Sequence, residues 1–197
     1  GKAYGGRRLT PFAVSEGVVA VAVGGSIAGE DCYTLFIKSD GSLWGMGNNW
    51  AGQLGDGTTT TRPYPVKIAD GVASVSVSAN GGRHSLFVKN DGSLWGMGYN
   101  NSGQLGDGSN TNRSTPVKIA DNVAVASAGA SHSLFLKADR QLFGMGLNTS
   151  GQLGQGNTIS SNVPVQIDVG VRKIAAGGSH SIYTTIDSIM AMGLNSS

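Results

Sequence analysis

Short alternations and runs of apolar residues recur along the chain, separated by polar stretches that are rich in glycine. Apolar and small residues alternate over Val72–Val77, and short apolar runs cover His84–Lys89 and Ser93–Met97. A further apolar segment, Val117–Ala120, follows a polar stretch of 19 residues. Runs this short, bounded by turn-forming residues, are typical of β-strands, so this part of the chain predicts four strands.

A turn sequence, Asn90-Asp91-Gly92, joins the two middle runs. Asp-Gly between two apolar runs is a strong hairpin signal, because glycine readily takes the positive φ that a type I′ turn or a G1-bulged turn requires. The same dipeptide stands at Asp40-Gly41. The sequence therefore predicts antiparallel hairpins at both places.

The arrangement returns along the chain, so the sequence is a repeat. A related hexapeptide, Ser-Leu-Trp-Gly-Met-Gly in its first two copies, occupies residues 42–47, 93–98, 141–146 and 188–193. After four intervening residues, a Gly-Gln-Leu-Gly tetrad follows the first three copies, at 52–55, 103–106 and 151–154. The last glycines of successive hexapeptides lie 51, 48 and 47 residues apart. Four antiparallel strands in each unit of about 50 residues are typical of a β-propeller blade.

One of the four units is split between the two ends of the sequence. Residues 8–16 resemble residues 113–121, and the last residues match the start of a loop that precedes a tetrad in the other units. We therefore expect units at about 17–70, 71–121 and 122–169, and a fourth at 170–197 completed by 1–16. Because the two ends of the sequence together make up one repeat unit, the chain fits a closed four-bladed ring, two chains joined as eight blades, or a piece of a longer array.

Composition supports an all-β chain. Glycine contributes 32 of the 197 residues, and 17 Val and 10 Ile stand against 13 Leu and only 2 Glu. Strong helix formers are therefore scarce and β-branched residues plentiful. The predicted fold class is an all-β propeller of four-stranded antiparallel blades, with four repeat units in this chain.

Charge and cysteine usage exclude some functions and leave others open. The 14 Lys and Arg against 12 Asp and Glu give a net charge of +2 without a basic run, which argues against nucleic acid as the partner. No run of 18 apolar residues exists to span a membrane, and no secretory signal core is present. Cys32 is the only cysteine, so no intrachain disulfide forms. The charge-poor surface, rich in Ser, Thr, Asn and Gly, favours an extracellular or cell-surface location.

The repeat resembles that of a known family. The regulator of chromosome condensation repeat is similar to the segment His84–Gly108, which includes DGSLWGMG and GQLGDG, together with Arg113–Val117 (RSTPV). The hairpin and loop sequences resemble the bacterial versions of this repeat. The resemblance implies a propeller that usually has seven blades, so a lone four-bladed ring would be strained and association or excision is favoured. The activities that it implies are nucleotide exchange on the Ran GTPase, chromatin binding, and β-lactamase inhibition by a secreted propeller.

Three histidines, His84, His132 and His180, stand 48 residues apart. Three imidazoles at equivalent positions of a ring can in principle bind a zinc ion. Each opens the second strand of its unit, however, and the resemblance marks this as a structural position. We therefore expect no metal and no cofactor, and ring nitrogens that bond to the local backbone.

The remaining polar residues give no catalytic site. Cys32 has no histidine near it in the sequence to act as a base. Asp56 and Asp107 stand in equivalent loops, and Asp40 and Asp91 in equivalent turns, so turn chemistry explains them and no acid–base pair stands out. The glycines of the tetrad loops have no helix after them to bind a phosphate. The chain is therefore predicted not to be an enzyme.

The loops vary between units while the strands repeat, so the loops are where recognition is expected. Trp50, Tyr99 and Tyr64 are aromatic residues in otherwise polar segments, and Asn49 and Asn100 stand beside the first two. We predict that these five residues bind a partner, the aromatic residues through buried area and the amides through orientation. The alternative is that Trp50 and Tyr99 fold back over a neighbouring blade.

The sequence thus favours a non-catalytic module that binds a protein or serves as a scaffold, bacterial and extracytoplasmic. The family resemblance supplies an alternative, a guanine-nucleotide exchange or chromatin-binding factor. A carbohydrate-active enzyme is the third possibility. Fold alone does not choose among them. The identity of the protein partner stays open.

Overall fold

The computed structural model describes residues 13–25, 31–78 and 80–194, and these residues form fifteen β-strands and no helix. The strands are β1 (Val18–Gly24), β2 (Tyr33–Lys38), β3 (Leu43–Gly47), β4 (Arg62–Ala69), β5 (Val72–Val77), β6 (His84–Lys89), β7 (Leu94–Gly98), β8 (Arg113–Ala120), β9 (Val123–Ala128), β10 (His132–Lys137), β11 (Leu142–Gly146), β12 (Ser161–Asp168), β13 (Lys173–Ala176), β14 (His180–Thr184) and β15 (Ile189–Gly193).

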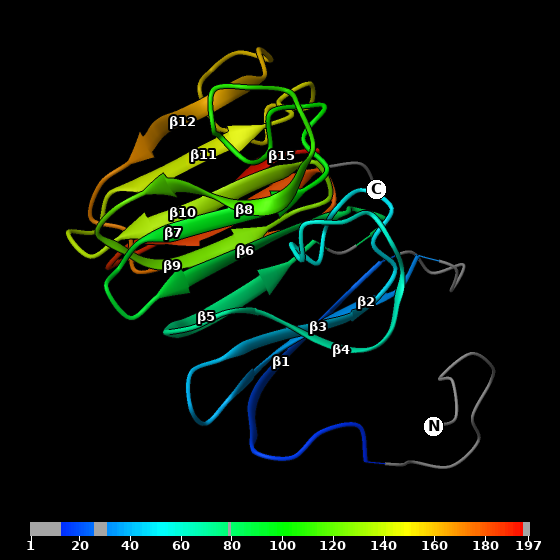
Figure 1. Ribbon diagram of the computed structural model, residues 1–197. Coiled ribbons are helices and arrows are strands. Elements are labelled where there is room, and N and C mark those ends of the chain that lie inside the picture. Colours follow the sequence, from blue (N-terminus) through cyan, green and yellow to red (C-terminus); the bar gives the residue numbers. More distant parts are fainter. Residues whose placement is uncertain (1–12, 26–30, 79, 195–197) are drawn as a thin grey trace.

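The strands form four antiparallel sheets that follow one another in chain order, from blue to red in Figure 1. The first sheet contains β1 to β4, the second β5 to β8 and the third β9 to β12; the fourth contains β13 to β15 among the described residues. The first strands of neighbouring sheets, such as β1 and β5, contact each other. Each sheet is therefore a blade whose first strand is innermost. The predicted all-β propeller of antiparallel blades is confirmed.

The second sheet agrees with the predicted strands except at its outermost strand. β5 and β6 have the predicted bounds, and β7 is shifted by one residue. β8 begins at Arg113, where the pattern predicted Val117. Because β8 is an edge strand and pairs with β7 through an irregular register, it accommodates Pro116. The polar segment before Val117 is therefore strand and not loop.

Residues 1–16 were predicted to complete the fourth unit, and most of them lie outside the described residues. The structure describes residues 13–16 of this segment, and they are not in a strand. The predicted unit boundaries therefore stay a prediction.

The apolar core lies between neighbouring sheets, because side chains along a strand alternate between the two faces of its sheet. In β6, Phe87 packs with Leu35 of the first sheet and with Leu54 of the loop between β3 and β4, whereas Leu86 and Val88 pack with residues of the third sheet. A further apolar cluster joins the third sheet to the fourth. Each junction between described sheets is thus a separate apolar layer.

The hairpin turns place a residue in the left-handed region, as the sequence predicted. Gly92 has a φ of 78°, its N–H donates to the Lys89 carbonyl at 2.9 Å, and the Lys89 N–H donates to the Ser93 carbonyl at 2.9 Å. This is the three-residue loop of a G1-bulged hairpin, one of the two expected turn types. The third sheet has Arg140 at the equivalent position, with a φ of 67°.

Candidate partner-binding surface

A buried asparagine anchors each of the first two tetrad loops. The Asn49 side-chain oxygen accepts the Leu54 N–H at 2.9 Å, and its amide nitrogen donates to Asp56 Oδ1 at 2.9 Å and to the Thr58 carbonyl at 3.0 Å. Asn100 makes the equivalent bonds in the second loop. Both asparagines are fully buried. They hold the loop from inside and cannot orient a partner, so we remove Asn49 and Asn100 from the candidate site.

An ion pair closes the same two loops. Arg62 Nε lies 2.5 Å from Asp56 Oδ2, and Arg113 Nε lies 2.6 Å from Asp107 Oδ2. Burial acts to raise the pKa of Asp56, but the hydrogen bonds from Thr58 and Arg62 outweigh it, so this pKa lies below its usual range. The same balance lowers the pKa of Asp107. Both carboxylates are therefore charged anchors of their loops.

Trp50 lies at the junction of the first and second sheets and is 45% exposed. Its indole Nε1 donates to Asp31 Oδ1 at 3.2 Å, and the Arg83 guanidinium lies over its ring, 4.4 Å from the centroid. Arg83 also pairs with Asp31 at 2.6 Å. The hydrogen bonds from Arg83 and then Trp50 hold the pKa of Asp31 below its usual value. We call Asp31, Trp50, Arg83 and Tyr99 the Trp50 cluster.

Tyr99, the residue that follows β7, completes this cluster. Its ring meets that of Trp50 edge to face, with centroids 6.5 Å apart and an interplanar angle of 67°. The structure therefore brings two of the predicted binding residues together. Tyr64 lies on the outermost strand β4 and is exposed. Trp50 contacts the neighbouring blade, as the alternative predicted, and yet keeps a large exposed area.

Sequence reasoning missed Asp31 and Arg83. These two residues are 52 positions apart and belong to different units, so nothing local connects them. One signal was available. The position just before the second strand holds Cys32, Arg83, Ser131 and Ser179 in successive units, so it varies in the same way as the loop position of Trp50.

The histidines contact successive sheets and do not converge. His84 Nε2 lies 2.8 Å from Ser133 Oγ of the third sheet, and His132 Nε2 lies 2.8 Å from Ser181 Oγ of the fourth. For His84 and His132 the prediction that the ring bonds to the local backbone is therefore wrong, because each of these two rings reaches a hydroxyl of the next blade. His180 is exposed on the fourth sheet.

Hydrogen-bond chemistry fixes the tautomer of His84. Ser133 Oγ donates to the Gln104 carbonyl at 2.8 Å, so it accepts from His84 Nε2–H, and His84 Nδ1 is left as a buried acceptor without a partner. Burial, followed by the charge on His132, lowers the pKa of His84 to about 3. Burial, followed by the charge on His180, lowers the pKa of His132 to about 4. Both rings are neutral at pH 7.

The described residues contain no cluster of potential metal ligands and no helix that could cross a membrane. Within them, no three His, Cys, Asp or Glu side chains lie close enough to hold a metal ion. Nor do these residues contain a helix with the length and apolar character needed to cross a bilayer.

Repeated antiparallel blades, joined by apolar layers and by buried histidine–serine contacts, define a repeat β-propeller. Two family models match the chain, and both describe the regulator of chromosome condensation (RCC1) repeat. One matches residues 40–88, 91–136 and 139–183, and the other matches 74–104 and 123–152. The chain belongs to the RCC1 repeat family.

The curated relatives are longer proteins. Human protein RCC2 is 38% identical over 107 residues, which are 53% of this chain and 20% of RCC2. The matched part thus spans about a fifth of RCC2 and of its mouse and zebrafish counterparts. These relatives are eukaryotic, so the comparisons lend no support to the predicted bacterial origin.

Solved structures show the same fold. Human WBSCR16 superimposes with a TM-score of 0.75 and 27% identity, over 89% of this chain and 47% of that one. Prp20p of Saccharomyces cerevisiae superimposes with a TM-score of 0.72 and 23% identity, over 92% of this chain and 46% of that one. The blades of this chain therefore follow the curvature of propellers that are about twice as long.

Proposed function

We propose that this chain is a non-catalytic protein-binding module of the RCC1 type, and that the Trp50 cluster is where it contacts its partner. The observation that supports the proposal is an exposed tryptophan held in one orientation by Asp31 and Arg83 at a blade junction. Tryptophan, tyrosine and arginine are the residue types that most often dominate binding energy at interfaces. A side chain fixed before binding loses little conformational entropy when the partner arrives.

The kind of partner follows from the chemistry of the cluster. Asp31 neutralises Arg83, so the surface offers an aromatic edge and hydrogen-bonding groups with little net charge. Such a surface suits an uncharged or amphipathic protein segment better than a phosphate backbone. The low overall charge, with 13% charged residues, agrees with this choice. An extracellular or cell-surface location stays part of the proposal, and it rests on composition alone.

Family membership supports a second candidate, a regulator that acts on a GTPase or on chromatin. The solved structure of Prp20p is described together with its binding to Gsp1p and histones. For this chain we propose the same two partner classes, a GTPase and histones, as the second candidate. Purified Gsp1p and core histones are therefore the probes for this candidate.

The test compares binding by three forms of the chain. Trp50→Ala removes the exposed ring, and Ile159→Ala is the matched control, because Ile159 is also exposed but lies in the loop of the third unit. We expect Trp50→Ala to weaken the binding of a partner found in an extract of the source organism by about 1–3 kcal/mol. Ile159→Ala should bind as the parent does. Circular dichroism and melting of each variant separate lost binding from lost folding.

Two outcomes would overturn the proposal. Equal capture of the partner by the parent chain and by Trp50→Ala would show that binding uses another surface. Saturable binding of Gsp1p or of histones, unaffected by Trp50→Ala, would favour the second candidate.

A further inference from the structure

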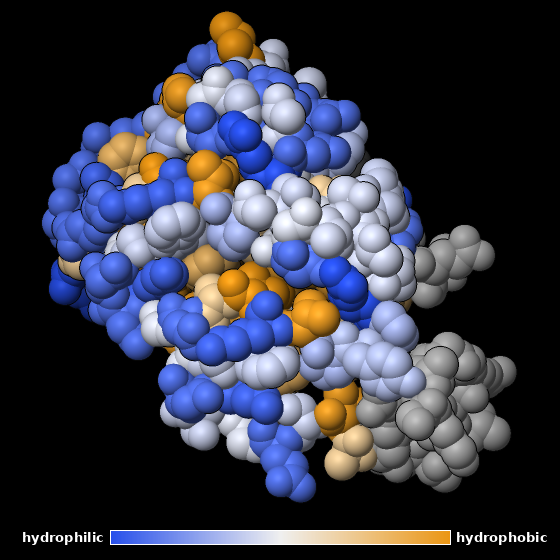
Figure 2. Space-filling view, viewed as in Figure 1, coloured by the Kyte–Doolittle hydropathy of each residue, from blue (hydrophilic) through white to orange (hydrophobic). Residues whose placement is uncertain are grey.

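The hairpin turns of the first three sheets lie at the left of Figure 1, at the opposite end of the strands from the tetrad loops. In the same view of Figure 2 this side of the molecule is mostly hydrophilic. At each junction between described sheets, a carbonyl of the turn accepts the N–H of the valine that starts the next unit. The acceptor and donor are Gly41 and Val72, Gly92 and Val123, and Arg140 and Val171. The three junctions therefore share one backbone arrangement and can be compared position by position.

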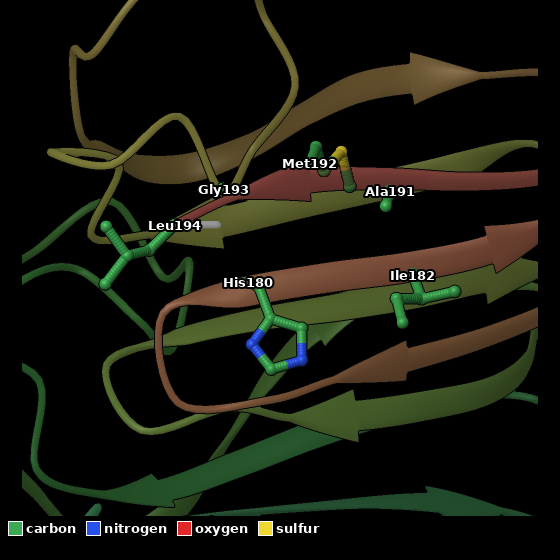
Figure 3. Close-up of a pocket in the computed structure, with 6 residues that line it drawn as sticks. All are labelled: His180, Ile182, Ala191, Met192, Gly193 and Leu194. Carbon is green, nitrogen blue, oxygen red and sulfur yellow. The ribbon is translucent and has the colours of Figure 1, made fainter. Parts of the chain in front are cut away.

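The junction between the third and fourth sheets concentrates positive charge. A hollow of about 410 Å³ lies there, and it is lined by four cationic side chains, Lys137, Arg140, Arg172 and Lys173, which we call the basic junction. No carboxylate of the described residues lines this hollow. Asp139 belongs to the same turn, but its carboxylate accepts hydrogen bonds from Gln141. By contrast, the hollow shown in Figure 3 beside β14 and β15 has His180 as its only ionisable side chain.

The charge of the basic junction is not neutralised within the part of the chain that the structure describes. There, none of the four cations forms an ion pair. Lys137 lies over the ring of Phe143, 5.0 Å from its centroid. Arg140, Arg172 and Lys173 are exposed, and their side chains make no hydrogen bond to the described residues. Three exposed cations thus share one hollow, where like charges repel each other.

The other two junctions show that blade packing does not require these cations. The equivalent hollow at the first junction, of about 520 Å³, has Lys38 and Asp40 as its only charged residues. The Arg140 position holds glycine at both of the other junctions, and the Arg172 position holds alanine. The Lys173 position holds serine at the first junction and valine at the second. The first two pairs of blades therefore pack without a cation at any of these three positions.

The exposure of these positions does not depend on where the described chain ends. Ala73 and Ala124, which stand at the Arg172 position, are exposed although the second and third sheets each have a sheet on both sides. Val125, at the Lys173 position of the third sheet, is 37% exposed. A blade that is covered on both faces thus keeps these positions accessible to a partner.

We infer that the basic junction binds an acidic segment of a protein partner through its aspartate or glutamate carboxylates. The planar guanidinium of arginine pairs with a carboxylate through two parallel hydrogen bonds. Arg140 and Arg172 are held as neighbours, because the Arg140 carbonyl accepts the N–H of Val171, the residue before Arg172. Adjacent carboxylates of one segment can therefore pair with both arginines, and Lys173 adds a third positive charge.

The distribution of charge favours an acidic protein segment over a nucleic acid. A polynucleotide carries a charge at every phosphate, so it is bound by cations spread along its path. The first two junctions instead expose Asp70 and Asp121, at the position of Val169 in the third unit. These carboxylates would repel a polynucleotide that continued across the blades, whereas a short acidic segment needs only the one hollow. The basic junction and the Trp50 cluster lie at opposite ends of the strands, so they are separate sites.

The test compares two fluorescein-labelled peptides, hexaglutamate and hexaserine, by fluorescence anisotropy at about 50 mM salt, where screening is weak. Arg172→Ala combined with Lys173→Ser gives this junction the residues of the first one, so folding should be kept. Lys67→Ala combined with Lys118→Ala is the matched control. It removes the same charge from two lysines that are exposed and lie outside the hollow.

We expect the parent chain to bind hexaglutamate at least about tenfold more tightly than hexaserine. Arg172→Ala with Lys173→Ser should lose at least about tenfold in affinity for hexaglutamate, whereas the control should stay within about threefold of the parent. Raising the salt concentration to about 0.5 M should weaken the binding, because the contacts are ionic.

Three results would overturn the inference. Equal binding of the two peptides by the parent chain would show that the hollow does not select carboxylates. An equal loss in the control would assign the binding to net charge and not to this junction. Hexathymidylate that binds more tightly than hexaglutamate, and is lost with the same double substitution, would make a nucleic acid the partner.

A second variant keeps the test decisive if circular dichroism shows that Arg172→Ala with Lys173→Ser unfolds. Arg140→Gly then replaces it, because glycine stands at this position in the first two junctions. This variant should bind hexaglutamate at least about threefold more weakly than the parent chain. Unchanged binding by folded Arg140→Gly would contradict the proposed contact.

Discussion

Ser133→Ala tests whether the buried histidine–serine contact holds two blades together. Ser133 is fully buried, and its hydroxyl accepts from His84 Nε2 at 2.8 Å while donating to the Gln104 carbonyl at 2.8 Å. Alanine keeps the backbone and the Cβ but removes both hydrogen bonds. The substitution therefore leaves a donor on the second sheet and an acceptor on its loop without a partner.

The cost follows from the number of groups left unpaired. A buried polar group that loses its partner costs about 1–3 kcal/mol. His84 Nδ1 already lacks a partner, so the ring has no second hydrogen bond to compensate. We expect Ser133→Ala to lower the free energy of unfolding by about 2–4 kcal/mol. This is a large fraction of the 5–15 kcal/mol that is usual for a domain.

Urea unfolding followed by far-UV circular dichroism measures this change. Ser102→Ala is the matched control, because the Ser102 side chain is partly exposed and makes no hydrogen bond to the described residues, so its effect should stay within about 0.5 kcal/mol. Combining Ser133→Ala with His84→Leu should reveal a coupling of about 0.5–3 kcal/mol. A Ser133→Ala chain as stable as the control would refute the reasoning.

Two further predictions concern backbone strain and pH. Arg140→Gly should raise the free energy of unfolding by about 0.5–1 kcal/mol, because Arg140 has a φ of 67° where the second sheet has Gly92. Gly92→Ala should lower the free energy of unfolding. Equal melting temperatures for the parent chain, Arg140→Gly and Gly92→Ala would contradict the argument from backbone strain. In the folded chain the pKa is about 3 for His84 and about 4 for His132. Between pH 6.5 and these values, each of the two histidines is protonated in the unfolded chain but not in the folded chain. The free energy of unfolding should therefore fall with falling pH in this window, by up to about 1.4 kcal/mol per pH unit for each histidine. His132→Gln should flatten the slope, and an unchanged slope would argue against buried neutral rings.

The strands and turns were predictable because they depend on residues close in sequence. Gly92 follows Asp91 between two apolar runs, and local φ preferences decide such a turn. The start of β8 was missed because Arg113 and its polar neighbours form an edge strand, where burial imposes no apolar pattern. Hydrophobic periodicity detects only strands that bury a face.

The candidate site was predictable only in part, because it depends on contacts between units. Trp50 and Tyr99 were found from their aromatic character in polar loops, but Asn49 and Asn100 were misjudged. Their recurrence beside each tetrad was a signal of a structural role, since a residue that recurs at the same position of successive units is expected to maintain the structure that the units share. The contact between Asp31 and Arg83 requires the packing of two blades, which no local pattern specifies.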